Sequence, residues 1–171
     1  MPMKTVRIVD YDVAWADAFQ GECARLRRAL GESVLDLHHI GSTAVPGLAA
    51  KPVIDILIEV GSLDELDARE SAMVALGYQP KGENGIGGRR YFQLGSTVRT
   101  HQAHAFVRGD RNIRRHLAFR DFLRTNQQAA QEYAQLKRAA AEACGGNSEI
   151  YRAMKDGFIK TFERVALIGN D

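Results

Sequence analysis

The residues best suited to chemistry lie in the segment 39–60, HIGSTAVPGLAAKPVIDILIEV. It begins with a turn of small residues, Gly41, Ser42 and Thr43, whose backbone N–H groups and hydroxyls are suited to holding phosphate oxygens. It ends in a run of branched aliphatic residues that contains Asp55. Mg²⁺ takes one or two carboxylates together with phosphate and water. We therefore expect the turn and Asp55 to form one phosphate and metal site.

Asp55 belongs to the strand predicted over residues 53–60, where successive side chains point to opposite faces of a sheet. The aliphatic face of this strand needs a covering helix, and Asp55 lies on the other face. Position 57 is leucine, so the acid that would complete a two-metal site is missing. Glu59 shares the face of Asp55 but lies about 13 Å along the strand. We therefore expect one metal ion or none.

A histidine is the expected companion of Asp55. Residues 97–107 predict a neighbouring strand, in which His101 and His104 point to opposite faces. At most one of them therefore faces Asp55, either as a metal ligand or general base, or as an ordinary hydrogen-bonded sheet histidine.

Two basic residues are candidates for phosphate contacts. Lys51 precedes Pro52, which favours an extended chain, and it either binds a phosphate or is a solvated loop lysine. Arg90 follows the glycine-dense loop 81–88, and we expect it, or its neighbour Arg89, to reach a triphosphate when the loop closes.

Other polar residues near the turn have two readings each. His39 either contacts substrate or forms a hydrogen bond that pins the turn. A later helix carries His116 with several arginines, which either line a cleft for an anion or form a solvated face: Arg115, Arg120 and Arg124.

The remaining pattern predicts an α+β domain with one mixed or antiparallel sheet and a C-terminal helical group. We expect helices over residues 14–30, 63–76, 112–124, 127–144 and 149–168, and strands over 34–40, 53–60, 90–94 and 97–107. The aliphatic face of the sheet should lie under helices and the polar face should be open. We treat residues 1–171 as one domain.

Composition limits the functional classes. The chain has 23 Lys and Arg against 21 Asp and Glu, a net charge of +2 that gives no sign of binding polymeric nucleic acid. No apolar run approaches the roughly 20 residues that span a bilayer. The first seven residues lack the apolar core of a signal peptide. The two cysteines lie far apart and suit a reducing compartment, so we expect a cytoplasmic protein.

An apolar residue followed by Gly-Ser and then by an Asp on an aliphatic strand resembles the signature of the nucleotidyltransferase superfamily with the DNA polymerase β-like fold. The whole segment 39–60 resembles the signature of the GrpB family, small bacterial proteins placed in that superfamily. Further resemblance covers VRIVDYDVAW at 6–15, HQAHAFV at 101–107, HLAFRDFLR at 116–124 and YRAMKDGFI at 151–159. The resemblance implies the nucleotidyltransferase fold and the site location, and some members are joined to the enzyme that phosphorylates dephospho-coenzyme A.

These observations predict an enzyme that transfers a nucleotidyl group from a nucleoside triphosphate to a small-molecule acceptor with Mg²⁺. Gly41, Ser42, Thr43, Lys51 and Arg90 would bind the nucleotide, while Asp55 and His104 would form the catalytic and metal centre. The alternative is a non-catalytic module for a nucleotide or a coenzyme A-type ligand, in which leucine at position 57 marks lost chemistry. The oligomeric state is not predicted.

Overall fold

A computed structural model describes residues 6–168, so most of the N-terminal segment considered above for a signal peptide lies outside the described residues. Within 6–168, one five-stranded sheet has the order β1-β2-β5-β4-β3. Its strands are β1 (Val34–Ile40), β2 (Ile54–Val60), β3 (Tyr78–Pro80), β4 (Arg90–Leu94) and β5 (His101–Val107). Strands β2 and β5 are parallel, and the other pairs are antiparallel. The predicted α+β class with a mixed sheet is therefore confirmed.

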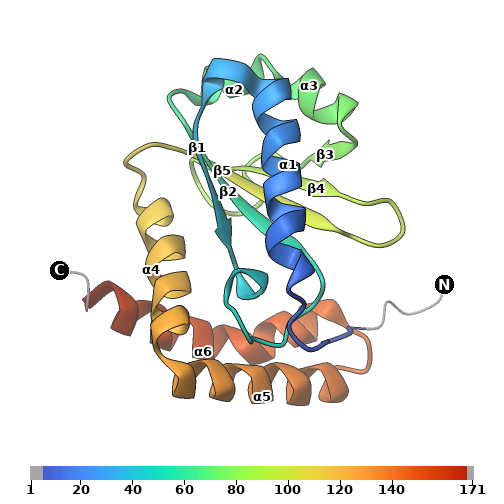
Figure 1. Ribbon diagram of the computed structural model, residues 1–171, viewed down its shortest axis with the longest axis vertical. Coiled ribbons are helices and arrows are strands. Elements are labelled where there is room, and N and C mark those ends of the chain that lie inside the picture. The colour runs from blue at the N-terminus through green and yellow to red at the C-terminus, as the bar shows by residue number, and fades with distance from the viewer. Residues whose placement is uncertain (1–5, 169–171) are drawn as a thin grey trace.

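One face of the sheet packs against the N-terminal helices (Figure 1). Helix α1 (Ala14–Leu30) has the predicted bounds and buries its apolar stripe against the aliphatic face of β2. The predicted helix 63–76 is instead two short helices, α2 (Leu63–Asp67) and α3 (Glu70–Ala75). The break comes where the Arg69 amide bonds to the Leu66 carbonyl, a tightened turn that ends α2.

The other face is not open as we expected. Helix α4 (Arg111–Thr125) lies over it, and Leu57 packs with Phe106 of β5 and Ile113 of α4. Leu57 is fully buried. The leucine that replaces a second acid therefore contributes to the hydrophobic contact between the sheet and α4.

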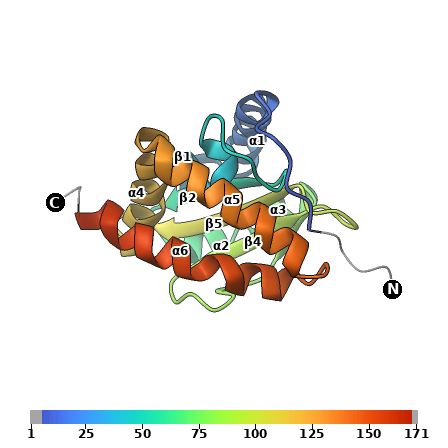
Figure 2. The ribbon, with the colours of Figure 1, turned by 90° about the horizontal axis from the view of Figure 1, so that it is seen from below.

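The C-terminal helical group lies across one end of the sheet (Figures 1 and 2). Helices α5 (Gln127–Ala143) and α6 (Ser148–Ile168) pack side by side, close to the predicted bounds, and the side chain of Asn147 caps α6. Val45 and Leu48, from the loop between β1 and β2, are buried in the aromatic core of this group. The loop that carries the small-residue turn is therefore held against the helices.

Among the described residues, no helix combines the length and the apolar character needed to cross a membrane.

Replacing Tyr78 with Phe is expected to destabilise the fold. The Tyr78 hydroxyl donates to Glu22 Oε1 at 2.8 Å, and both residues are buried, so the bond fastens β3 to α1. Tyr78→Phe removes one partner of a buried carboxylate and should lower the free energy of unfolding by about 1–3 kcal/mol in urea titrations. Tyr11→Phe is the control, because the Tyr11 hydroxyl has no hydrogen bond within residues 6–168. Equal losses in the two variants would contradict this assignment.

Candidate functional site

The site lies where β1 ends and β2 begins, because Ile40 pairs with Asp55 in the antiparallel register. Gly41 follows with φ of 74°, a conformation that favours glycine. A Cβ atom at this position would lie 2.5 Å from Asp55 Oδ2. The turn and the carboxylate therefore approach one another closely only because residue 41 has no side chain.

Contacts of His39 and Thr43 with the core hold the turn in place. The His39 Nε2 lies 2.9 Å from Thr43 Oγ1, and its ring stacks on Phe19 of α1 with the ring centroids 4.7 Å apart. Thr43 also donates to the Val53 carbonyl at 3.4 Å. His39 thus pins the turn, and the buried Thr43 hydroxyl is committed to it.

Helix α4 fixes the same turn from the other side. Arg120 Nη1 donates to the His39 carbonyl at 3.2 Å, and Arg124 Nε donates to the Ala44 carbonyl at 2.9 Å. Both guanidinium groups are therefore bonded to the backbone beside the turn, although Arg124 remains exposed. They satisfy backbone acceptors on both sides of the Gly41–Ser42 turn.

Two hydrogen bonds from β5 orient the Asp55 carboxylate. His104 Nε2 lies 3.2 Å from Asp55 Oδ1, and the Gln102 amide donates to the same oxygen at 3.0 Å while accepting from Arg99 Nη1 at 2.9 Å. Because both bonds go to Oδ1, Oδ2 is left beside Gly41. The Asp55 side chain is 25% exposed, so this carboxylate is accessible from solvent.

His104 is itself held by the glycine-dense loop. Arg89 Nη1 lies 3.5 Å from His104 Nδ1, and the same guanidinium donates to the Glu83 and Asn84 carbonyls at 3.0 and 2.7 Å. A guanidinium only donates, so this contact assigns the acceptor role to Nδ1 and leaves Nε2 to donate to Asp55. His116 packs beside His104, with ring centroids 5.5 Å apart, and burial holds the pKa of His116 well below its usual value.

The C-terminal helices complete the site on its third side. Burial dominates and raises the pKa of the Tyr133 hydroxyl, although the nearby Ser42 side chain lowers it. The half-buried Lys51 places Nζ 4.7 Å from the centre of the Tyr151 ring. Burial lowers the pKa of Lys51, with the nearby arginines acting in the same direction and Asp55 opposing them.

The structure therefore brings together most of the residues predicted from the sequence: Gly41, Ser42, Lys51, Asp55 and His104. The Thr43 backbone belongs to the turn, while its side chain faces the interior. Arg90 is not brought to the site. It pairs with Ala105 in the register, on the face opposite Asp55, and it forms a two-pronged ion pair with Asp67 at 2.8 and 3.0 Å.

Sequence reasoning missed Gln102 and Tyr133. Gln102 has the same strand parity as His104, so alternation places both side chains on the face of Asp55 once His104 is assigned to it. Tyr133 lies on a helix far along the chain and gave no comparable signal. Only the packing of α5 against the loop between β1 and β2 brings its hydroxyl to Ser42.

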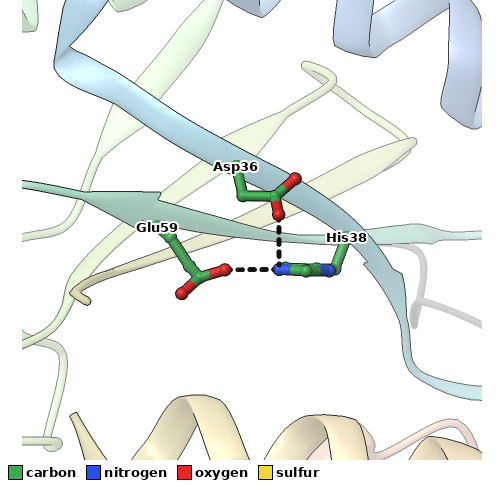
Figure 3. Close-up of side chains that lie close together, drawn as sticks. All are labelled: Asp36, His38 and Glu59. Carbon is green, nitrogen blue, oxygen red and sulfur yellow. Dashed lines mark hydrogen bonds and ion pairs between the residues drawn. The ribbon is translucent and has the colours of Figure 1, made fainter. Parts of the chain in front are cut away.

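A second polar group lies farther along the same face of β1 and β2 (Figure 3). His38 Nε2 lies 2.6 Å from Glu59 Oε2 and 3.8 Å from Asp36 Oδ2. Arg108 Nε lies 3.5 Å from Glu59 Oε1. Glu59 is therefore committed to basic partners in this group, in line with the expectation that it does not share a metal ion with Asp55.

The residues around Asp55 suit one hard cation and no more. Among residues 6–168, the only group of three or more His, Cys, Asp or Glu ligand atoms near enough to share an ion is Asp36, His38 and Glu59. Asp55 offers one carboxylate, and His104 Nε2 is already directed to it. This donor set fits a single Mg²⁺ that receives its other ligands from phosphate and water.

Comparison with known proteins places this geometry in a family. A family model described as GrpB protein matches residues 5–164. The UPF0157 protein YqkA of Bacillus subtilis (strain 168) is 46% identical over 96% of the chain, and the chain spans 48% of its length. The crystal structure of the conserved protein GrpB from Enterococcus faecalis superposes with a TM-score of 0.92 at 40% identity, covering 96% of this chain and 99% of that one.

More distant structures share the fold alone. The Cid1 poly(U) polymerase with Mg 3′-dATP bound superposes with a TM-score of 0.55 at 15% identity, over 79% of this chain and 43% of that one. The sheet and its surrounding helices are thus of the nucleotidyltransferase type.

Gly41→Ala is expected to be more damaging than Gly47→Ala. Both glycines have positive φ, so each substitution incurs a backbone cost of about 1–2 kcal/mol. Only at Gly41 does the new Cβ also meet Asp55, whereas nothing lies within 4 Å of it at Gly47. We expect Gly41→Ala to lose about 1–3 kcal/mol more than Gly47→Ala in urea unfolding. Equal losses of unfolding free energy in the two variants would show that the turn can move away from Asp55 at no cost.

The pinned turn should make stability depend on pH. Burial lowers the pKa of His39 to about 4, with Asp55 opposing the shift and Arg124 and Arg120 adding to it. The unfolded chain takes up this proton near pH 6.5, so the contribution is present above that pH and is lost as the pH falls toward 4.

His39→Gln should therefore reduce the drop in unfolding free energy between about pH 7.5 and pH 5 by about 2 kcal/mol. Urea titrations at the two pH values measure this difference. An unchanged pH dependence in His39→Gln would contradict the buried, neutral state of His39.

Proposed function

The chain belongs to the GrpB family, and we propose that it is a nucleotidyltransferase-type enzyme that uses Mg²⁺ to transfer a nucleotidyl group from a nucleoside triphosphate to a small acceptor. One observation carries the proposal: the Gly41–Ser42 turn lies directly against the Asp55 carboxylate. A turn suited to phosphate and a carboxylate suited to a hard cation are thereby combined in one place. The nucleotidyltransferase fold of the neighbouring structures supports the same reading.

In this proposal the phosphates of the nucleotide lie along the turn. The Ser42 hydroxyl and the neighbouring backbone provide hydrogen bonds, and Lys51 provides positive charge from the loop that leads into β2. The acceptor hydroxyl attacks the α-phosphorus and gives up its proton to water. The bond between the α-phosphorus and the bridging oxygen of the β-phosphate breaks, and pyrophosphate leaves. The residues of the chain mainly position the reactants and neutralise charge, which are the principal contributions in phosphoryl-group transfer.

Asp55 would hold Mg²⁺ through Oδ2, the oxygen that lies beside Gly41. When bound, the ion would neutralise charge on the phosphate oxygens. His104 and Gln102 act as positioning residues, because both bond to Oδ1 and so fix the carboxylate plane. The earlier expectation that His104 is a metal ligand is replaced here by an indirect role. Arg90 has no part, since Asp67 holds it on the other face.

A non-catalytic module for a nucleotide or a coenzyme A-type ligand is the second candidate. The observation that favours it is the single carboxylate: Leu57 is buried under α4 where a second metal-binding acid would lie. Such a module would bind phosphates at the same turn but would not break a bond.

Asp55→Asn tests the first candidate. The amide keeps the size of the side chain but removes the charge that a cation needs, so Mg²⁺ should no longer tighten nucleoside triphosphate binding. We expect the affinity in the presence of Mg²⁺ to fall by about tenfold or more, measured by titration calorimetry with and without the ion. Release of pyrophosphate with a panel of small hydroxyl acceptors should stop. Asp17→Asn, an exposed acid on α1, is the control and should change neither quantity.

The outcomes separate the two candidates. Triphosphate binding that ignores Mg²⁺ and survives Asp55→Asn would reject the enzyme and favour the binding module. A protein that binds no triphosphate under either condition would reject both.

A further inference from the structure

An unpartnered lysine lies buried beside the candidate site. Lys137 of α5 is 2% exposed, and its Nζ has no hydrogen-bond partner within residues 6–168. The Nζ lies 4.5 Å from the centre of the Tyr133 ring, and the Tyr133 hydroxyl is influenced by the Ser42 side chain. A cation–π contact offsets only part of the cost of burying an ammonium group. The position therefore needs either a neutral amine or an anion.

Two further lysines surround the neighbouring aromatic ring. Lys51 Nζ and Lys155 Nζ lie 4.7 and 5.0 Å from the centre of the Tyr151 ring, and neither forms an ion pair in the described part of the chain. The charge of Lys51 lowers the pKa of Lys155, and the charge of Asp55 raises the pKa of both lysines. Lys155 also acts on Lys137, so the three ammonium groups form one electrostatic unit, the lysine cluster.

Charge in this region is not balanced by the protein itself. Within residues 6–168, Asp55 is the only carboxylate whose charge acts on Lys51 or Lys155, while Arg99 and Arg152 add positive charge. Arg138, which acts on Lys137, is paired with Asp10 at 2.6 Å. Burial, followed by these like charges, lowers the pKa of Lys137 to about 7 and of Lys155 to about 8. An anion beside these groups would restore their protonated state.

We propose that Lys51, Lys137 and Lys155 form a subsite for the terminal phosphates of a polyphosphate, which they bind without a metal ion. A chain of phosphates fits the arrangement because it would extend from the Ser42 turn and Asp55 toward α5 and α6. The inference deepens the proposed function and rests on it for the placement of phosphates at Ser42. It adds that the C-terminal helices supply the charge that the sheet lacks, and that the ligand is at least a diphosphate.

The test uses inorganic triphosphate, with the full chain, in EDTA, so that neither a nucleoside nor a metal ion contributes. Titration calorimetry at about pH 8 should detect binding, and Lys137→Met and Lys155→Met should each weaken it about tenfold or more. Lys160→Met is the matched control on α6, because Lys160 is exposed and paired with Asp156 at 2.8 Å. Its affinity should equal that of the wild type.

Proton uptake is a second readout that a merely structural role would not produce. Titrations in two buffers of different ionisation enthalpy should show protons bound together with triphosphate, and Lys137→Met should reduce the number taken up. Lys137→Met also removes an unpaired buried amine, so its melting temperature should not fall. If it does fall, Lys155→Met still decides the question.

The outcomes distinguish this inference from the proposed function. Triphosphate binding that is unchanged in both lysine variants, or that requires Mg²⁺, would overturn the subsite. Inorganic monophosphate binding as tightly as triphosphate would overturn the assignment of a polyphosphate. A third outcome separates the two proposals. If triphosphate binding in EDTA depends on the lysines, but nucleotide binding in Mg²⁺ does not depend on Asp55, the subsite is upheld and the proposed enzyme is rejected.

Discussion

The close approach of Gly41 to the Asp55 carboxylate is the constraint on which the site depends. It follows from the pairing of β1 with β2, which places the last residue of one strand opposite the second residue of the next. The turn and the acid are thus joined by the hydrogen-bond ladder of the sheet. The intervening loop is free to pack elsewhere, and its apolar residues lie in the core of the C-terminal helices.

That arrangement makes the helical group part of the site. The guanidinium groups of Arg120 and Arg124 bond to carbonyls on both sides of the turn, and the Ser42 side chain influences the pKa of Tyr133 on α5. Bonds from a charged donor are stronger than those between neutral groups, and leaving a buried carbonyl unpaired is costly. A displacement of α4 or α5 would therefore be felt at Ser42, even though both helices are distant from the turn in sequence.

Alternation and helical periodicity predicted what depends on one element alone: the bounds of α1, and the placement of His101 and His104 on opposite faces of β5. They failed where two elements must be combined. Leu57 was expected on a solvent-exposed face, because the sequence around it does not predict that α4 covers it. Arg90 was misplaced because its face follows from the register of β4 against β5. Lys137 was overlooked because a lysine on an amphipathic helix is ordinarily solvated.

Two polar groups on the same face of β2 differ in how their charges are paired. Around Glu59, acidic and basic side chains pair directly: His38 contacts both Glu59 and Asp36 (Figure 3), and Arg108 contacts Glu59. Around Asp55, one carboxylate faces an excess of cations from α6 and the loop before β2. Side chains that already pair with one another are stabilised little by a bound ion, whereas a bound anion stabilises an excess of half-buried positive charge. The difference follows from the C-terminal helices, which contribute lysines to only one of the two groups.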